Sequence, residues 1–260
     1  MNLKVTAIQS DLYWEDVAQN LAMFAKKIGA ISEQTDLIIL PEMFNTGFSM
    51  NSAALAETMD GDSICWMIAQ AKNSNAVVVA SLIVADNGKF YNRLIWAQPD
   101  GEIKSYDKRH LFRMANEHHH FDAGMERIII TYKGWKICPL VCYDLRFPVW
   151  SRNTSENQYD LLIYIANWPA VRKAPWSKLL EARAIENQCY VVGVNRVGED
   201  GKGFAYSGNS AIINPKGEPI SDIPEGENHS TTLNLSLAEL NDFRKIFPVG
   251  MDADGFEIIP

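Results

Sequence analysis

The chain has 260 residues, 47% of them hydrophobic and 22% charged, and its 32 acidic and 24 basic residues give a formal net charge of -8. A chain of this length buries a sizeable core, so it needs neither disulfides nor a structural metal to fold. The acidic balance argues against nucleic acid or an anionic membrane surface as the main partner, but a few buried cations can still bind an anionic substrate.

The first residues, MNLKVTAIQSDLYW, lack the apolar h-region and the small-residue cleavage site of a secretory signal. No apolar run approaches the roughly 20 residues that a membrane-spanning helix needs. The four cysteines form no CxxC pair. We therefore predict a cytoplasmic protein with reduced thiols, which does not bind a membrane.

Apolar runs typical of strands recur along the chain, several with consecutive Val and Ile, as in strands covered on both faces. We expect strands at Leu3–Ile8, Asp36–Leu40, Ala76–Val84, Leu94–Gln98, Arg127–Thr131, Trp135–Cys142, Asp160–Ala166, Tyr190–Asn195, Ser210–Asn214 and Thr232–Leu235. Apolar residues at three- and four-residue steps predict helices at Asp16–Ile31, Asp62–Asn73 and Pro175–Gln188. Since there is no long linker or internal repeat, we predict one layered α/β domain over residues 1–260.

Reactive side chains follow these predicted strands at three places. Glu42 follows the buried run DLIILP, Cys142 ends the run WKICPLVC just before a turn, and Lys108 lies in the polar loop of GEIKSYDKRHLF. Ligands of α/β folds gather outside strand ends, so these residues are candidates for one site.

The three residue types suit amide hydrolysis without histidine. A cysteine attacks as the thiolate, and its unperturbed pKa of about 8.5 leaves only a small thiolate fraction at neutral pH. A nearby lysine cation favours the thiolate and stabilises an oxyanion. A glutamate within reach takes the thiol proton, gives it to departing ammonia and then activates the hydrolytic water.

The sequence resembles the nitrilase superfamily of carbon–nitrogen hydrolases in three motifs: LPEMF around Glu42, YDKRHLF around Lys108 and VCYDLRFP around Cys142. The resemblance spans nearly the whole chain and implies a four-layer α-β-β-α sandwich, with glutamate as base, lysine as oxyanion support and cysteine as nucleophile. It further implies a second glutamate near the lysine, here Glu117, and an oxyanion contact from the backbone N–H of Tyr143. It implies no metal or organic cofactor, and it implies a homodimer paired sandwich to sandwich.

Within the superfamily, the segments FNTGFSM, KRHLFRMANEHHHFDAG and IANWPAVR are most similar to the omega-amidase branch. This similarity implies that α-ketoglutaramate and α-ketosuccinamate are hydrolysed through a cysteine thioester to the 2-oxo dicarboxylate and ammonia. The far carboxylate of such a small-molecule amide calls for a cation, and arginine matches it best. We rank Arg113 ahead of Arg146 and Arg172 because it lies in the same segment as Lys108.

Three aromatic side chains are candidates for the apolar walls of the substrate pocket: Phe44, Tyr143 and Trp168. Trp168 can instead be core packing, Arg146 can pair with Asp144, and Glu117 can form a surface ion pair. The remaining cysteines, Cys65, Cys138 and Cys189, lie in apolar runs, and we predict that all three are core residues.

Two further clusters have structural interpretations. Arg183 and Glu186, three residues apart in a predicted helix, favour an ion pair. The histidines at 118–120 point alternate ways in an extended segment and have no partner at ligand spacing, so we predict no metal site.

The catalytic motifs alone leave the substrate open. A nitrilase, a carbamoyl-amine hydrolase or a general aliphatic amidase would use the same three residues. A catalytically silent family member that serves as a scaffold is the non-enzymatic alternative, and the intact Glu42, Lys108 and Cys142 argue against it.

Overall fold

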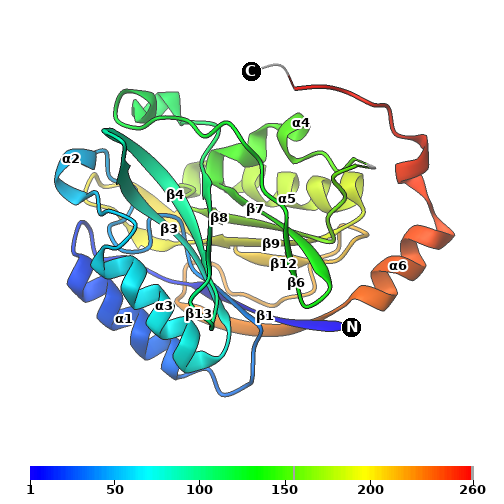
Figure 1. Cartoon of the computed structure of the whole chain (residues 1–260), viewed down its shortest axis with the longest axis horizontal. Coiled ribbons are helices and arrows are strands. Elements are labelled where there is room, and N and C mark those ends of the chain that lie inside the picture. The colour runs from blue at the N-terminus through cyan, green and yellow to red at the C-terminus, as the bar shows by residue number, and fades with distance from the viewer. Residues whose placement is uncertain (155, 259–260) are drawn as a thin grey trace.

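The computed structural model describes residues 1–154 and 156–258, and it stacks two β-sheets between helices (Figure 1). The first sheet has the strand order β13-β1-β2-β3-β4-β5, and the second has the order β12-β9-β8-β7-β6. The strands of the first sheet are β1 (Asn2–Gln9), β2 (Leu37–Ile39), β3 (Val77–Asp86), β4 (Lys89–Ala97), β5 (Ile103–Asp107) and β13 (His229–Ser236). Those of the second are β6 (Ile130–Tyr132), β7 (Trp135–Val141), β8 (Leu161–Ala166), β9 (Tyr190–Asn195) and β12 (Ala211–Ile213).

Helices cover both outer faces of the paired sheets. On one side lie α1 (Val17–Gly29) and α3 (Asp62–Ser74), and on the other lies α5 (Lys173–Asn187), as Figure 1 shows. Short helices α2 (Ser52–Leu55) and α4 (Pro148–Ser151) occupy connections, and α6 (Leu237–Ile246) follows β13. Gly193 on β9 allows α5 to pack closely, because a Cβ there would lie 2.4 Å from Leu180 Cδ1.

Two apolar cores hold these layers together. One lies between the sheets and combines inward residues of β1 to β4, such as Val5 and Trp96, with those of β7 to β9, such as Ile137 and Ile163. The other lies between the first sheet and helices α1 and α3, where Phe24 and Met67 are fully buried. The central parallel strands β2, β3, β7, β8 and β9 are buried on both faces, which explains their unbroken Val and Ile runs.

The predicted four-layer α-β-β-α sandwich is confirmed. Each expected strand overlaps an observed one, although Arg127–Thr131 does so only at its end, because β6 begins at Ile130. The sequence pattern did not predict strand β5, helices α2, α4 and α6, or the hairpin of β10 (Val197–Glu199) and β11 (Ala205–Ser207), all of which are short or partly exposed.

One core prediction was wrong. Cys65 is exposed on the outer surface of α3, whereas Cys138 and Cys189 are buried. The helix repeat explains the difference, since the buried Ile64 and Met67 define the inner face of α3. The Arg183–Glu186 ion pair is confirmed, with Nη1 and Oε1 3.0 Å apart. Within the described residues, no helix is long and apolar enough to cross a membrane.

Candidate active site

Four polar side chains follow the carboxyl ends of strands and meet at one edge of the stacked sheets. Glu42 follows β2, and Lys108 directly follows β5 in the first sheet. Cys142 directly follows β7, and Asn167 directly follows β8 in the second sheet. The site is therefore assembled across both sheets, as the positions of Glu42, Lys108 and Cys142 at strand ends had suggested.

A buried charge cluster forms the first part of this site. Lys108 Nζ lies 2.9 Å from Glu42 Oε1 and 2.9 Å from each carboxylate oxygen of Glu117. All three side chains have no solvent exposure. This burial excludes a solvated loop role for Lys108 and a surface ion pair for Glu117.

Two asparagines hold the Glu42 carboxylate in place. Asn92 Nδ2, from β4, donates to Oε1 at 2.8 Å, and the backbone N–H of Asn167 donates to Oε2 at 2.7 Å. The Asn167 side-chain amide also donates to the Glu42 backbone carbonyl. The Glu42 carboxylate therefore faces the inter-sheet site with a fixed orientation.

The candidate nucleophile starts a tight 3₁₀ turn, η3 (Cys142–Arg146), with a φ of 45°. This left-handed conformation is strained for a cysteine and persists only where neighbouring structure fixes it. Asp144 supplies such an anchor, because its buried carboxylate accepts hydrogen bonds from the Tyr106 hydroxyl at 2.8 Å and the backbone N–H of His110 at 3.0 Å. Tyr106 and His110 flank Lys108, so Asp144 ties the cysteine turn to the lysine segment.

The charges around the thiol oppose one another. Burial raises the pKa of Cys142 well above its ordinary value, and Glu42 raises it further, whereas Lys108 lowers it. Burial lowers the pKa of Lys108, but Glu117 and Glu42 more than offset this, so its pKa lies above the ordinary value and the ammonium stays charged. Lys108 therefore favours the thiolate as expected, but burial and the Glu42 carboxylate outweigh it, so the pKa of the thiol stays raised.

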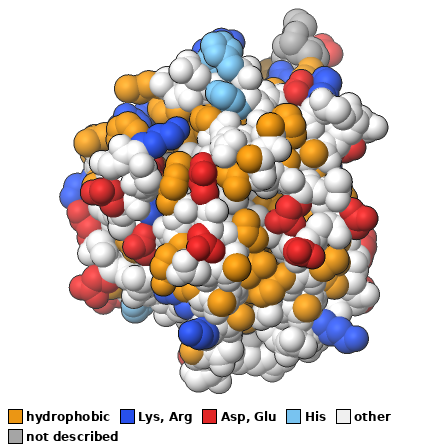
Figure 2. Space-filling view, turned by 90° about the vertical axis from the view of Figure 1, so that its left-hand side faces the viewer, with side chains coloured by type: hydrophobic (Ala, Val, Ile, Leu, Met, Phe, Trp, Pro, Cys, Tyr) orange, Lys and Arg blue, Asp and Glu red, His pale blue; other side chains and the backbone are white. Residues whose placement is uncertain are grey.

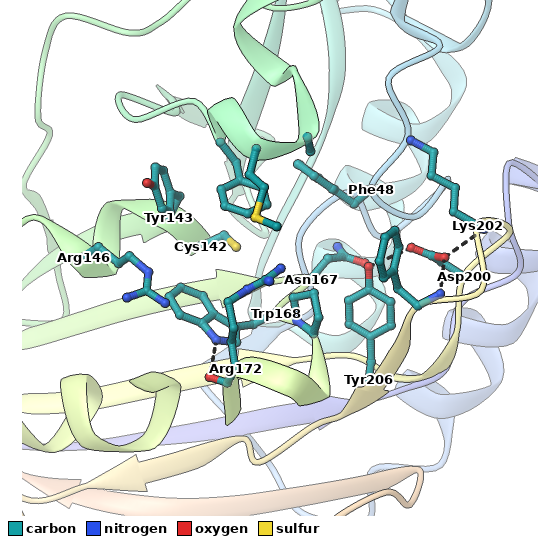
Figure 3. A pocket seen from close by; sticks show the side chains of 15 residues that line it. Phe48, Cys142, Tyr143, Arg146, Asn167, Trp168, Arg172, Asp200, Lys202 and Tyr206 are labelled. Carbon is teal, nitrogen blue, oxygen red and sulfur yellow. Dashed lines mark hydrogen bonds between the residues drawn. The ribbon is translucent and has the colours of Figure 1, made fainter. Parts of the chain in front are cut away.

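A cavity of about 180 Å³ opens beside Cys142 (Figure 3). Its wall is mostly apolar and comes from the loops after β2, β5, β7 and β8 and from the β10–β11 hairpin, with these residues: Phe48, Phe112, Met114, Ala115, Tyr143, Trp168, Pro169, Phe204 and Tyr206. This size suits a molecule of a few heavy atoms.

Two guanidinium groups give the cavity a cationic side. Arg146 lies 4.9 Å from the centre of the Trp168 ring, and Arg172 lies 5.3 Å from the centre of the Phe112 ring. Figure 3 shows Arg172 reaching into the cavity toward Cys142. Neither guanidinium forms a hydrogen bond or ion pair within residues 1–154 and 156–258.

The only carboxylate in the described cavity wall, Asp200, is already engaged by its own hairpin. It accepts from the Tyr206 hydroxyl at 2.8 Å and from the backbone N–H groups of Lys202 and Phe204 at 2.9 and 3.0 Å. The two arginines are therefore the wall groups best suited to an anion.

The structure corrects three pocket predictions. Arg113 is exposed in the turn η1 (Arg113–Ala115) and does not line the cavity, because this turn directs the neighbouring Phe112 and Met114 to the wall instead. Phe44 packs in the core against Trp66, with ring centres 5.5 Å apart, and Phe48 from the same loop takes the expected place at the wall. Arg146 does not pair with Asp144.

Two residues of this site were not predicted from the sequence. Asn167, in IANWP, directly follows a buried strand, which is the pattern that identified Glu42 and Cys142. Asn92 is a fully buried polar residue of β4, two positions before the apolar run 94–97, so a polar residue next to a buried run was the available signal.

The molecular surface agrees with the acidic composition. Figure 2, which views the left side of Figure 1, shows acidic and apolar side chains interspersed across the middle and basic ones scattered toward the edges. This face of the described chain has no continuous basic surface of the kind that binds nucleic acid.

Comparisons with known proteins agree with the geometry. The family model described as carbon-nitrogen hydrolase matches residues 4–245. The chain is 48% identical over 256 residues, 98% of each chain, to "Omega-amidase YafV" of Escherichia coli (strain K12), and 32% identical over 252 residues, 96% of each, to "2-oxoglutaramate amidase" of Bacillus subtilis. It superposes with a TM-score of 0.97, at 42% identity over 99% of each chain, on the crystal structure of XC1258 from Xanthomonas campestris, a CN-hydrolase superfamily protein with an arsenic adduct in the active site.

Proposed function

The chain belongs to the carbon-nitrogen hydrolase family, and from this premise we propose that it is an omega-amidase that hydrolyses small 2-oxo acid amides to a 2-oxo dicarboxylate and ammonia. The observation that carries this proposal is the buried Glu42–Lys108–Glu117 cluster beside Cys142, at a cavity whose wall includes two arginines. The names of the two similar enzymes, an omega-amidase and a 2-oxoglutaramate amidase, support the substrate class.

The proposed reaction has two halves that share one base. Because the pKa of the Cys142 thiol is raised, the proton leaves as the sulfur attacks, and Glu42 accepts it. When the C–N bond breaks, Glu42 gives this proton to the nitrogen, and ammonia leaves behind a thioester. Water then attacks the thioester carbonyl while Glu42 takes its proton, and the C–S bond breaks as the sulfur regains a proton and the acid is released.

The tetrahedral intermediates need donors for their oxyanion. We assign this role to Lys108 and to the backbone N–H of Tyr143, which belongs to the first, unpaired N–H groups of the η3 turn. Both oxygens of Glu117 lie 2.9 Å from Lys108 Nζ and can share one of its N–H groups. A second N–H goes to Glu42, so the third is left for the oxyanion. Glu117 would thus orient the ammonium and keep it charged.

The far carboxylate of the substrate would bind the guanidinium of Arg172, with Arg146 next to it. Both guanidiniums lie against aromatic rings that hold them in place, and both retain free N–H donors. Tyr143 and Trp168 would form the apolar walls around the short carbon chain of the substrate.

The substrate panel that tests this function compares ammonia release from α-ketoglutaramate, a neutral aliphatic amide, a ureido acid and a nitrile. We expect the highest kcat/KM for α-ketoglutaramate, because only it combines a primary amide with a carboxylate at matching separation. Faster turnover of the ureido acid or the nitrile would contradict the omega-amidase proposal and favour another activity of the family.

Arginine variants provide the control for this panel. A charge-assisted hydrogen bond is worth about 1.5–3 kcal/mol, so Arg172→Leu should lower kcat/KM for the anionic amide roughly 10- to 100-fold, mainly through KM. The neutral amide should be hydrolysed at nearly the native rate. Lys216→Leu, far from the cavity over the Phe243 ring, is a matched loss of one cation and should change neither substrate.

A homodimer and a cytoplasmic location are separate proposals. The dimer is supported by exposed apolar side chains on α6 and the segment after it, where Ile246 is 82%, Phe247 59% and Met251 84% exposed. Figure 1 shows these elements at the edge of the sandwich. Light scattering should give twice the 29.2 kDa chain mass, and a monomer mass at micromolar concentration would contradict pairing.

A further inference from the structure

Asn167 carries a buried hydrogen-bond acceptor with no partner. Its side chain lines the cavity, the residue is 3% exposed, and Oδ1 has no hydrogen bond in the described chain. Leaving a buried acceptor unpaired costs stability, so such an atom beside a nucleophile indicates a partner supplied by the substrate.

The orientation of this amide follows from its neighbour. The other side-chain atom of Asn167 faces the backbone carbonyl of Glu42, which can only accept, so that atom must be the nitrogen. The oxygen is therefore the atom left without a partner. The backbone N–H of the same residue donates to Glu42 Oε2, so Asn167 lies on the Oε2 side of the base.

A primary amide brings two N–H donors into this site. Glu42 Oε1 is occupied by Lys108 and Asn92, at 2.9 and 2.8 Å, so proton exchange with the substrate takes place at Oε2. Oε2 can accept one amide N–H. The second N–H needs another acceptor, and the Asp200 carboxylate of the wall is already used by its hairpin.

We propose that Asn167 Oδ1 accepts a hydrogen bond from the amide nitrogen of the substrate, and holds this nitrogen beside Glu42 Oε2 until it leaves as ammonia. This inference rests on the proposed amidase function and adds a residue that recognises the leaving group. In this arrangement the carbonyl oxygen of the substrate would point toward Lys108 and the backbone N–H of Tyr143, the acyl tail toward Arg172, and the nitrogen toward Asn167.

The test compares an amide with an ester of the same acid. In the methyl ester of the omega carboxyl group, methoxide replaces the NH₂ group, so the leaving group has no N–H to donate. In Asn167→Leu, kcat/KM for α-ketoglutaramate should fall about 10- to 100-fold more than kcat/KM for this ester. The value kcat/KM reports the steps through acylation, in which the leaving group departs, so slow thioester hydrolysis does not mask the difference.

Two matched variants separate leaving-group recognition from support of Glu42. Asn92→Leu removes a donor to Glu42 from a residue outside the cavity wall, and it should slow amide and ester equally. Asn167→Asp keeps an acceptor oxygen but loses the side-chain N–H that donates to the Glu42 backbone carbonyl. It should therefore lower both rates and keep a nearly native ratio of amide to ester hydrolysis. If Asn167→Leu fails to fold, Asn167→Val takes its place with the same expectation.

The outcomes distinguish the two proposals. A selective loss of amide hydrolysis in Asn167→Leu, absent in Asn92→Leu, supports recognition of the leaving group. An equal loss of both reactions overturns it and leaves Asn167 as a support for Glu42, and no loss overturns it and excludes both roles. A native enzyme that hydrolyses neither substrate would instead overturn the amidase function itself.

Discussion

Cys142→Ala is expected to abolish ammonia release, to below one part in about 10⁴ of the native rate, while the protein stays folded. The reaction proposed here has no route without the sulfur, since water alone would have to attack an amide that is positioned for a thiol. The side chain is small and buried at the cavity wall, so its loss removes little packing. Ammonia release and a thermal unfolding curve, measured on the same preparation, check both parts.

The control for this experiment is the exposed thiol. Cys65→Ala, on the outer surface of α3, should keep native turnover. Iodoacetamide should inactivate the native enzyme through Cys142, and substrate should slow this inactivation by filling the cavity. Residual turnover near the native level in Cys142→Ala would remove the nucleophile assignment and revive the silent-scaffold alternative.

The pH dependence of alkylation follows from the same environment. Burial and the Glu42 carboxylate raise the pKa of the Cys142 thiol, so the thiolate fraction keeps increasing above the ordinary cysteine range of about 8.5. The rate of Cys142 alkylation should therefore continue to rise above that pH. The alkylation rate of the exposed Cys65, measured at the same pH values, is the reference. In Glu42→Gln, the loss of the negative charge should move the Cys142 profile to lower pH.

The sequence predicted those site residues that short motifs identify. Glu42, Lys108 and Cys142 each follow a strand, and the order of strands in the two mixed sheets brings those ends together. The resemblance supplied Glu117, and the structure places it on Lys108 with full burial. No local pattern reveals the 2.9 Å contact between Glu117 and Lys108, since eight residues lie between the two along the chain.

The pocket wall was harder to predict, because the direction of a loop side chain depends on tertiary contacts. Phe44 and Phe48 belong to one loop and have the same chemistry, yet one lies in the helix–sheet core and the other at the cavity. Arg113 and Arg172 both lie in short 3₁₀ turns, yet only Arg172 lines the cavity. Asn167 could have been found, since it occupies a strand end as Cys142 does, but an amide carries no charge or nucleophile to draw attention to it.

Lys108→Met is expected to affect both activity and stability. It removes an oxyanion donor, which costs about 10²- to 10³-fold in kcat in other enzymes, and it leaves two buried carboxylates without their cation. Breaking a buried ion pair by removing one partner destabilises proteins by about 3–5 kcal/mol. Ammonia release and chemical denaturation provide the two measurements.

The sign of the pH effect in this variant is fixed by Glu117. Burial raises the pKa of this carboxyl, and Lys108 is the main influence that lowers it, so the folded-state pKa must rise further in Lys108→Met. The folded protein then holds a proton that the unfolded chain, with a glutamate pKa of about 4.3, releases. Stability relative to the native protein should therefore be greatest below that unfolded pKa and decline as the pH rises through the folded pKa.

A second substitution separates charge from geometry. Lys108→Met combined with Glu117→Gln leaves one buried carboxylate, Glu42, which still accepts hydrogen bonds from Asn92 and Asn167. The double variant should regain part of the lost stability and lose the pH dependence that comes from Glu117, because one of the two uncompensated carboxylates is gone. It should stay inactive because it lacks the ammonium. If no stability were regained, the loss in Lys108→Met would not come from the Glu117 carboxylate but from the lost contact with Phe48, whose ring centre lies 5.1 Å from Lys108 Nζ.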